Sequence, residues 1–235
     1  MAIQAGETTF HQAKRGIVQN GLVLNLDAGV EESYNGGTTW IDLEGSNNGT
    51  LTNSPAFDSD NGGSISFDGT DDYVGFSDDM IDPNQNWTLS TFINRTVSQT
   101  STIICGPSQS LQVRFDGTGY YEGHIKILHS TLATVVTFTN FGPRGSVQRS
   151  LDVWYNITIT KSSYTYSLYI DGESNQSVTD GSSVTFNNDP NDIGRRVFGS
   201  EYLSGKLANL SFYNRTLTAA EILQNFNAMK HRFGI

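Results

Sequence analysis

The chain has 235 residues, of which 36% are hydrophobic and 16% charged, and its formal net charge at pH 7 is −10. An acidic protein repels phosphate backbones and anionic lipid headgroups, so this charge argues against nucleic-acid and membrane binding. The 13 Phe, 10 Tyr and 3 Trp supply enough apolar bulk for a packed core and argue against a disordered chain.

The first 20 residues differ from the rest. They are mixed polar, and we interpret residues 1–20 as an arm that precedes the domain. Its candidate attachment residues are Phe10, His11, Lys14 and Arg15. The arm has neither a basic start nor an apolar run, so we expect no secretory signal and synthesis in a cytoplasm. No stretch of the chain approaches the about 20 apolar residues that a transmembrane helix needs.

From residue 21 onward, short apolar segments alternate with turn clusters rich in Gly, Asn and Asp. About a dozen of these segments have the period-2 pattern of a β-strand, such as Ser64–Asp68, Trp87–Ile93 and Tyr164–Ile170. No helical pattern lies between successive strands, which disfavours a parallel sheet with crossover helices. The pattern predicts one all-β domain over residues 21–235, either a two-sheet antiparallel sandwich or a barrel.

One helix is predicted, at about 218–231. Thr218 and Glu221 have the spacing of a capping box, in which each side chain accepts a hydrogen bond from the other residue's backbone amide. The apolar residues of the segment recur at helical spacing: Ile222, Phe226 and Met229. One stripe of the helix is therefore expected to pack on the sandwich.

The carboxylates do not form a hydrolase pattern. Retaining glycoside hydrolysis needs two of them about 5–5.5 Å apart, as an E-x-D-x-E strand provides, and this chain has no such strand. Serine-hydrolase, zinc-protease and P-loop motifs are also missing from the sequence. The sequence therefore predicts that the protein is not an enzyme.

Acidic turns are the candidate metal ligands. The turns are Asp68–Asp72, Asp78-Asp79 and Asp189–Asp192, and the candidate ligands are the pair Asp71 and Asp72 and the pair Asp78 and Asp79. Carboxylate oxygens are the ligands that Ca²⁺ takes, but Asp is also a strong turn former and neither pair has EF-hand spacing. A calcium site and a simple turn both remain open, and no other cofactor is expected.

Four aromatic residues are candidates for stacking on a sugar ring: Tyr34, Trp40, Tyr120 and Tyr121. Tyr and Trp combine an apolar face with a polar edge, which suits both a sugar site and a protein core. For each of the four residues, burial in the protein core is therefore the alternative to a sugar-binding role.

Several segments, taken in order, resemble laminin-G-like, concanavalin A-like jelly-roll domains. Ser64–Val74 resembles the family's Phe-Asp-Gly-x-Asp-Asp-Tyr-Val segment, and Leu168–Gly172 resembles its Leu-Tyr-Val-Asp-Gly strand end. Gly205–Ile222 is similar to the last strand and the start of the following helix. The resemblance implies a jelly-roll sandwich. Ala208-Asn209 replaces a frequent acidic pair, so it implies no metal ligand here.

A narrower resemblance concerns the ends of the domain. The segments Gly21–Gly29, Gly37–Leu43 and Glu221–Ile235 are similar to a subgroup found in structural proteins of tailed phages, notably marine and cyanobacterial ones. This implies a virion structural protein: a capsid decoration, a tail fibre or a tail-associated module. Its partners would be other virion proteins, and a homo-oligomer is expected of such an appendage. The alternative is a glycan-binding adhesin that recognises host surface polysaccharide.

Overall fold

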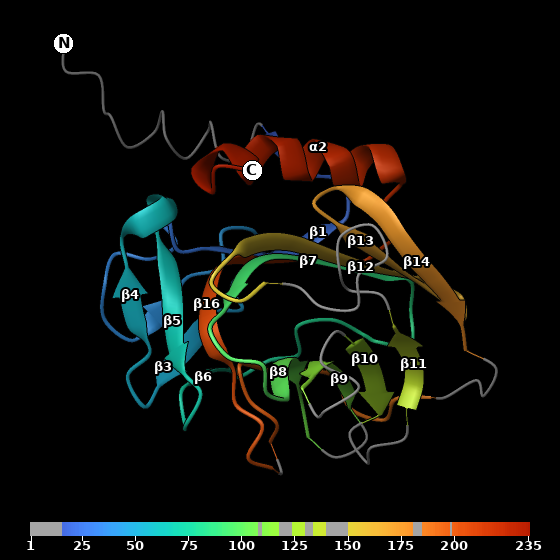
Figure 1. The fold of residues 1–235 in the computed structure, drawn as a ribbon, viewed down its shortest axis with the longest axis horizontal. Coiled ribbons are helices and arrows are strands. Elements are labelled where there is room, and N and C mark those ends of the chain that lie inside the picture. The colour runs from blue at the N-terminus through green and yellow to red at the C-terminus, as the bar shows by residue number, and fades with distance from the viewer. Residues whose placement is uncertain are drawn as a thin grey trace.

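The computed structural model describes residues 16–107, 110–117, 124–129, 134–139, 150–180, 185–197 and 199–235. Two sheets of antiparallel strands face each other across one apolar core, which confirms the predicted jelly-roll sandwich (Figure 1). Among the described residues, no helix has the length and apolar character needed to cross a bilayer.

Sheet A carries the C-terminal helix on its outer face. In spatial order it consists of β14 (Glu173–Thr179), β13 (Thr165–Ile170), β12 (Trp154–Ser162), β7 (Trp87–Arg95), β16 (Ser204–Tyr213), β5 (Ser64–Asp68) and β4 (Ala56–Asp58), with β1 (Leu22–Asp27) also paired to β16. The central strand β7 lies between β12 and β16, which come from distant parts of the chain.

Sheet B forms the other half of the sandwich. In spatial order it consists of β11 (Thr134–Phe138), β10 (His124–His129), β9 (Leu111–Asp116), β8 (Ser101–Cys105), β15 (Asp192–Ile193), β6 (Tyr73–Phe76), β3 (Gly49–Thr52) and β2 (Thr39–Trp40). A short 3-10 turn, η1 (Asp60–Gly62), joins β4 to β5 in sheet A.

The core between the sheets is built by alternate residues of the strands. Trp87, Leu89 and Ile93 of β7 point into it and are fully or almost fully buried. Trp87 makes edge contacts with the rings of Tyr166 and Phe212, at centroid distances of 6.1 and 6.4 Å. Strand alternation therefore places Trp87, Tyr166 and Phe212 on the core face of sheet A.

Helix α2 (Ala219–Met229) and the 3-10 turn η4 (Lys230–Arg232) cover the outer face of sheet A (Figure 1). The predicted capping box is present. The Thr218 hydroxyl accepts a hydrogen bond from the Glu221 amide, and the Glu221 carboxylate accepts one from the Thr218 amide. The predicted stripe is confirmed, because Ile222 and Phe226 are buried and Met229 is partly buried. The whole of β7 except its last residue is consequently buried on both faces.

The first described residues, 16–18, pack against this helix. Ile17 and Val18 are buried, and the Val18 amide donates to Asn225 Oδ1 at 2.8 Å. The Tyr213 hydroxyl donates to the Val18 carbonyl at 3.0 Å. A Cβ on Gly16 would lie 2.7 Å from Ala228 Cβ, so glycine permits this close approach. Residues 16–18 of the predicted arm therefore pack on the domain, because the apolar side chains of Ile17 and Val18 are buried against α2 and Tyr213.

Candidate functional site

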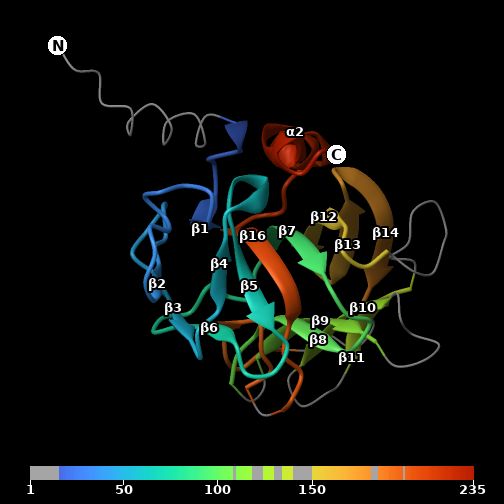
Figure 2. The ribbon, with the colours of Figure 1, turned by 60° about the vertical axis from the view of Figure 1, so that its left-hand side comes forward.

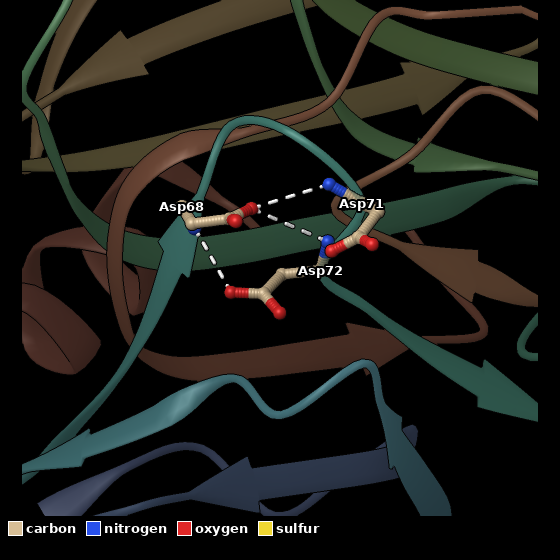
Figure 3. Close-up of side chains that lie close together, drawn as sticks. All are labelled: Asp68, Asp71 and Asp72. Atoms are coloured by element: carbon tan, nitrogen blue, oxygen red, sulfur yellow. Dashed lines mark hydrogen bonds between the residues drawn. The ribbon is translucent and has the colours of Figure 1, made fainter.

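The β5–β6 loop brings three carboxylates together (Figure 3). Asp68, Asp71 and Asp72 each place one oxygen within 4.8 Å of the others. Asp68 Oδ1 accepts hydrogen bonds from the amides of Thr70, Asp71 and Asp72, at 2.7, 3.2 and 3.4 Å. Asp72 Oδ2 accepts one from the Asp68 amide at 3.0 Å. These bonds fold the loop and account for the positions of Asp68 and Asp72.

The electrostatics of the loop follow from these contacts. Hydrogen bonds from the Thr70 amide and its neighbours lower the pKa of Asp68. Burial raises the pKa of Asp72, and repulsion from Asp68 and Asp71 adds to that rise. The oxygens that the loop's hydrogen bonds do not use are hard ligands of the kind that could hold Ca²⁺. The structure therefore groups the predicted ligands Asp71 and Asp72 and adds Asp68, whose signal in the sequence was the segment Asp-Gly-Thr-Asp-Asp.

The other predicted pair, Asp78 and Asp79, lies outside this cluster, in the β6–β7 loop. The backbone carbonyls of both residues accept from Asn47 Nδ2, at 3.4 and 3.1 Å. Burial, followed by repulsion from Asp79 and Asp82, raises the pKa of Asp189 to about 6. The four predicted metal ligands thus divide between two separate acidic groups.

Asp189→Asn is expected to stabilise the protein at pH 8 and to have little effect at pH 4. The folded-state pKa of Asp189, about 6, exceeds its ordinary value of 3.8, so the folded state holds this proton more tightly than the unfolded chain. That stabilisation is complete below pH 3.8 and is lost as the pH rises through 6. Thermal melting at pH 4 and pH 8 checks this, with Asp60→Asn as the surface control. A lower melting temperature of Asp189→Asn at pH 8 would contradict it.

Two of the four predicted sugar-stacking residues belong to the core. Trp40 is 0% exposed and Tyr34 is 8% exposed, and both line the main apolar cluster. The Tyr34 hydroxyl donates to the Gly37 carbonyl, and its ring lies 5.4 Å from that of Phe57. The sugar-stacking prediction for Tyr34 and Trp40 was wrong, because the segment between β1 and β3 turns both rings inward. Two more predicted sugar residues and all four predicted attachment residues lie outside the described residues: Tyr120, Tyr121, Phe10, His11, Lys14 and Arg15.

A polar surface that the sequence did not indicate lies on the outer face of sheet B. Along β9, Leu111, Val113 and Phe115 face the core, so the residues between them face outward. Neighbouring strands and the β15–β16 loop add further polar side chains to this surface. We define the sheet B outer face by the following residues: Gln112, Arg114, Asp116, Lys126, Asp192, Arg195, Arg196 and Glu201.

Ion pairs connect these side chains. Glu201 accepts from two guanidinium groups, with Arg114 Nη1 at 3.1 Å and Arg196 Nη1 at 3.3 Å. Arg195 pairs with Asp192 at 3.3 Å, and its guanidinium lies 3.5 Å from the centroid of the Tyr73 ring.

A third pair joins Lys126 to Asp116. Four cationic side chains on the sheet B outer face therefore meet three carboxylates. Among the residues that define this face, the cationic side chains thus outnumber the carboxylates by one, on a protein whose net charge is −10.

Several buried polar atoms on the sheet B outer face have no hydrogen-bond partner within the described part of the chain. Gln112 is 0% exposed, and its Nε2 donates to Thr102 Oγ1 at 3.0 Å while its Oε1 is unpaired. The Nε atoms of Arg114, Arg195 and Arg196 are also unpaired. Buried polar atoms in folded proteins are nearly always bonded to protein or water. These four atoms are unpaired within the described part of the chain but are not exposed on the sheet B outer face, where the partly exposed groups are those of Arg114, Arg196 and Glu201.

These observations define a jelly-roll domain with a helix on one face and a polar surface on the other. A laminin G family model, described as the concanavalin A-like lectin/glucanases superfamily, matches residues 68–223. The chain belongs to this superfamily. The resemblance of the sequence to laminin-G-like domains is thereby confirmed.

Solved structures share the fold at low identity. The Trypanosoma rangeli sialidase in complex with sialic acid is 16% identical, with a TM-score of 0.64, over 96% of this chain and 38% of that one. The botulinum neurotoxin serotype D binding domain is 16% identical, with a TM-score of 0.66, over 88% of this chain and 51% of that one. The serotype D ligand-binding domain in complex with N-acetylneuraminic acid is 15% identical, with a TM-score of 0.65, over 88% of this chain and 50% of that one. This chain spans 38% to 51% of the length of these chains, and at this identity the likeness extends to the fold alone. No curated protein matches the sequence at a significant level.

Proposed function

We propose that the protein is a non-catalytic carbohydrate-binding domain and that the sheet B outer face is its binding surface. The observation that carries this proposal is the cluster of partly exposed charged groups formed by Arg114, Arg196 and Glu201. Sugars present hydroxyl groups that both donate and accept hydrogen bonds, so they can bind both the guanidinium groups and the carboxylate of this cluster. Support also comes from the superfamily, whose description includes lectins, and from structural neighbours crystallised with sialic acid and N-acetylneuraminic acid.

The absence of catalysis is part of the proposal. Burial, followed by repulsion from Asp79 and Asp82, raises the pKa of Asp189 to about 6, which is the direction in which a general acid is tuned. A retaining glycosidase also needs a second carboxylate about 5–5.5 Å away, as an E-x-D-x-E strand provides. The sequence has no such strand, which supports a binding role.

We propose further that this domain is displayed on a tailed-phage particle, as a capsid decoration, fibre or tail-associated module. The resemblance of the two ends of the domain to phage structural proteins supports this role. Residue 16 enters the fold beside α2 (Figure 2), whereas sheet B lies on the opposite side of the sandwich. Attachment through residues 1–15 would thus leave the sheet B outer face directed away from the particle. The partners would be virion proteins, further copies of the chain and a host glycan, and the protein would reach the virion after synthesis in the host cytoplasm.

A glycan array tests the carbohydrate-binding proposal. The purified protein is expected to retain glycans, and an array repeated with EDTA shows whether an acidic group such as Asp68–Asp72 contributes through Ca²⁺. No retention with or without EDTA would contradict the proposal. Turnover of any bound glycan would contradict its non-catalytic part.

Deletion of residues 1–15 is expected to abolish incorporation into particles without unfolding the domain. Ile17 and Val18 remain in this variant and keep their contacts with α2. Incorporation is measured by mass spectrometry of purified particles, and folding by thermal melting. A matched deletion of residues 1–20 removes the buried pair and is expected to lower the melting temperature as well. Normal incorporation of the shorter deletion would exclude attachment through the arm.

A further inference from the structure

We propose that Asn35 is a modification site, at which the folded protein spontaneously deamidates to aspartate and isoaspartate. This inference does not depend on the proposed carbohydrate-binding function. It follows from the four Asn-Gly pairs of the sequence, which the fold holds in different ways: Asn20-Gly21, Asn35-Gly36, Asn48-Gly49 and Asn61-Gly62.

An Asn-Gly pair offers little steric hindrance to this reaction. Hydroxide deprotonates the backbone nitrogen of the glycine, and this nitrogen forms a bond to the side-chain carbonyl carbon Cγ of the asparagine. The side-chain nitrogen takes up a proton and leaves as ammonia. Glycine has no Cβ to obstruct the attack and adopts a wide range of backbone conformations. Water then opens the five-membered succinimide ring at either of its carbonyls, which gives aspartate or isoaspartate.

The Asn35-Gly36 pair has the freedom that ring closure needs. It lies in the loop between β1 and β2, and both of its residues are exposed (Figure 2). Within the ranges that the structure describes, neither the Asn35 side chain nor the Gly36 amide makes a hydrogen bond. Gly36 and Gly37 have φ angles of 104° and 84°, and apart from their chain neighbours no atom lies within 4 Å of where a Cβ would be on either. The Gly36 nitrogen therefore has space to approach Asn35 Cγ.

The Asn48-Gly49 pair is fixed by sheet B. Asn48 Oδ1 accepts a hydrogen bond from the Asp42 amide at 2.9 Å, which holds the side chain that would react. Gly49 is buried at the start of β3, where it is paired with Trp40 on one side and with Phe76 on the other. Both reacting groups of this pair are thus held in place by neighbouring strands.

The other two pairs are held at their backbone carbonyls. Both carbonyls of Asn61-Gly62 accept hydrogen bonds from Arg232, at 3.1 and 3.3 Å. Those of Asn20-Gly21 accept from Arg215 Nε and from the Asn214 amide, each at 2.8 Å. Ring closure rotates the peptide group between asparagine and glycine, so these hydrogen bonds oppose it. Among the described residues, the pair in the β1–β2 loop is the one without such a restraint.

The reaction changes a loop that lies directly beside the core. An isoaspartate linkage adds a methylene group to the main chain two residues before Gly37, whose carbonyl accepts from the Tyr34 hydroxyl at 3.0 Å. The Tyr34 ring lies 5.4 Å from that of Phe57. Deamidation at Asn35 thus places a new negative charge and a longer main chain next to a buried tyrosine.

The test is incubation of the full chain at pH 8.5 and 37 °C, folded in buffer and, in parallel, unfolded in guanidinium chloride. A protease that cleaves before aspartate then places the four pairs in separate peptides, 1–26, 27–41, 42–57 and 60–67, and mass spectrometry measures the conversion of each. An isoaspartate product leaves its peptide intact at a higher mass, and an aspartate product creates a new cleavage site.

In the folded protein, peptide 27–41 is expected to convert at least about tenfold faster than the other three, because reacting groups that are held out of alignment lose rate. In the unfolded chain the four pairs are expected to convert at similar rates, since the same dipeptide is then free of the restraints of the fold.

Asn35→Gln is the matched control. It keeps the side-chain amide, but its longer side chain would have to close a six-membered ring, which forms more slowly. Conversion of peptide 27–41 is expected to be lost in this variant, while that of the other three peptides is unchanged. An isoaspartate methyltransferase, which transfers a methyl group from S-adenosylmethionine to isoaspartate, is expected to label the aged wild-type protein and not the aged variant. Because Asn35 is exposed, the variant is expected to fold, and thermal melting checks this.

Three outcomes would overturn the inference. The first is equal conversion of the four pairs in the folded protein, or faster conversion of another pair. The second is an intact peptide 27–41 in the folded protein alongside conversion in the unfolded chain. The third is an equal advantage of Asn35 in the folded and unfolded chains, which would show that neighbouring residues and not the fold select this site. An advantage that is present in the folded protein, lost on unfolding and lost in Asn35→Gln would support the inference.

Discussion

Replacing Phe92 by Ala is expected to lower the free energy of unfolding by about 3–5 kcal/mol, the usual range for a buried Phe-to-Ala change. Phe92 is 1% exposed on the outer face of β7. Its ring stacks on Phe226 at a centroid distance of 6.1 Å and on Phe233 at 4.4 Å, so it anchors both α2 and the chain that follows the helix. The change leaves a cavity beneath two aromatic rings and weakens the attachment of the C-terminal segment.

Urea unfolding measures this loss of stability. The control is Leu223→Ala in α2, the helix that packs on Phe92. Leu223 is 44% exposed, so its truncation is expected to cost well below 1 kcal/mol apart from small changes in helix propensity. Equal destabilisation by Phe92→Ala and Leu223→Ala would contradict the packing described for α2.

Replacing Arg232 by Ala is expected to cost about 3–5 kcal/mol, because it leaves a buried carboxylate without its partner. Arg232 Nη1 binds both oxygens of Asp27, at 2.8 and 3.0 Å. Its remaining nitrogens donate to the carbonyls of Asn61, Gly62 and Gly63, so one side chain fastens η4 to the β1 end and to η1. The loss is measured by urea unfolding at pH 7.

The pH dependence of this loss provides a second check. Burial raises the pKa of Asp27, and the Arg232 guanidinium opposes that rise. Without Arg232 the folded-state pKa of Asp27 increases further above its ordinary value of 3.8, so the folded variant holds the proton more tightly than its unfolded chain. The variant therefore regains stability as the pH falls toward 4, and its deficit against wild type is largest at pH 7 to 8.

The double variant Asp27→Asn, Arg232→Ala removes the unpaired charge and is expected to be more stable at pH 7 than Arg232→Ala alone. A deficit of Arg232→Ala that is the same at pH 4 and pH 8, with no recovery in the double variant, would show that the ion pair with Asp27 is not its cause.

Much of the fold follows from local signals. Period-2 segments predicted the strands, and the Thr218–Glu221 pair predicted the start of α2. Other features depend on distant packing. Phe92 is buried on the outer face of β7 only because α2 covers it. Ile17 is buried only because α2 and Tyr213 form a surface against which it packs. Local patterns could not show which face of a strand a later helix would cover.

The candidate site was harder to predict than the fold. Arg114 and Glu201 are 87 residues apart in the chain and meet only because the β15–β16 loop returns beside β9. Scattered arginines in an acidic sequence carry no local pattern that marks them as a group. For Trp40 the sequence indicated a site that the structure does not have. An aromatic residue in a glycine-rich segment suited a sugar-stacking role, but Trp40 fills the core.

A crystal structure of the protein soaked with an oligosaccharide retained on the glycan array tests the central claim most directly. We predict that the sugar lies on the sheet B outer face, in contact with the partly exposed side chains of Arg114, Arg196 and Glu201. A sugar bound elsewhere, such as at the Asp68–Asp72 loop or over the exposed ring of Tyr164, would contradict the assignment of the site. An absence of bound sugar at saturating concentration, with the sheet B outer face free of lattice contacts, would contradict it as well.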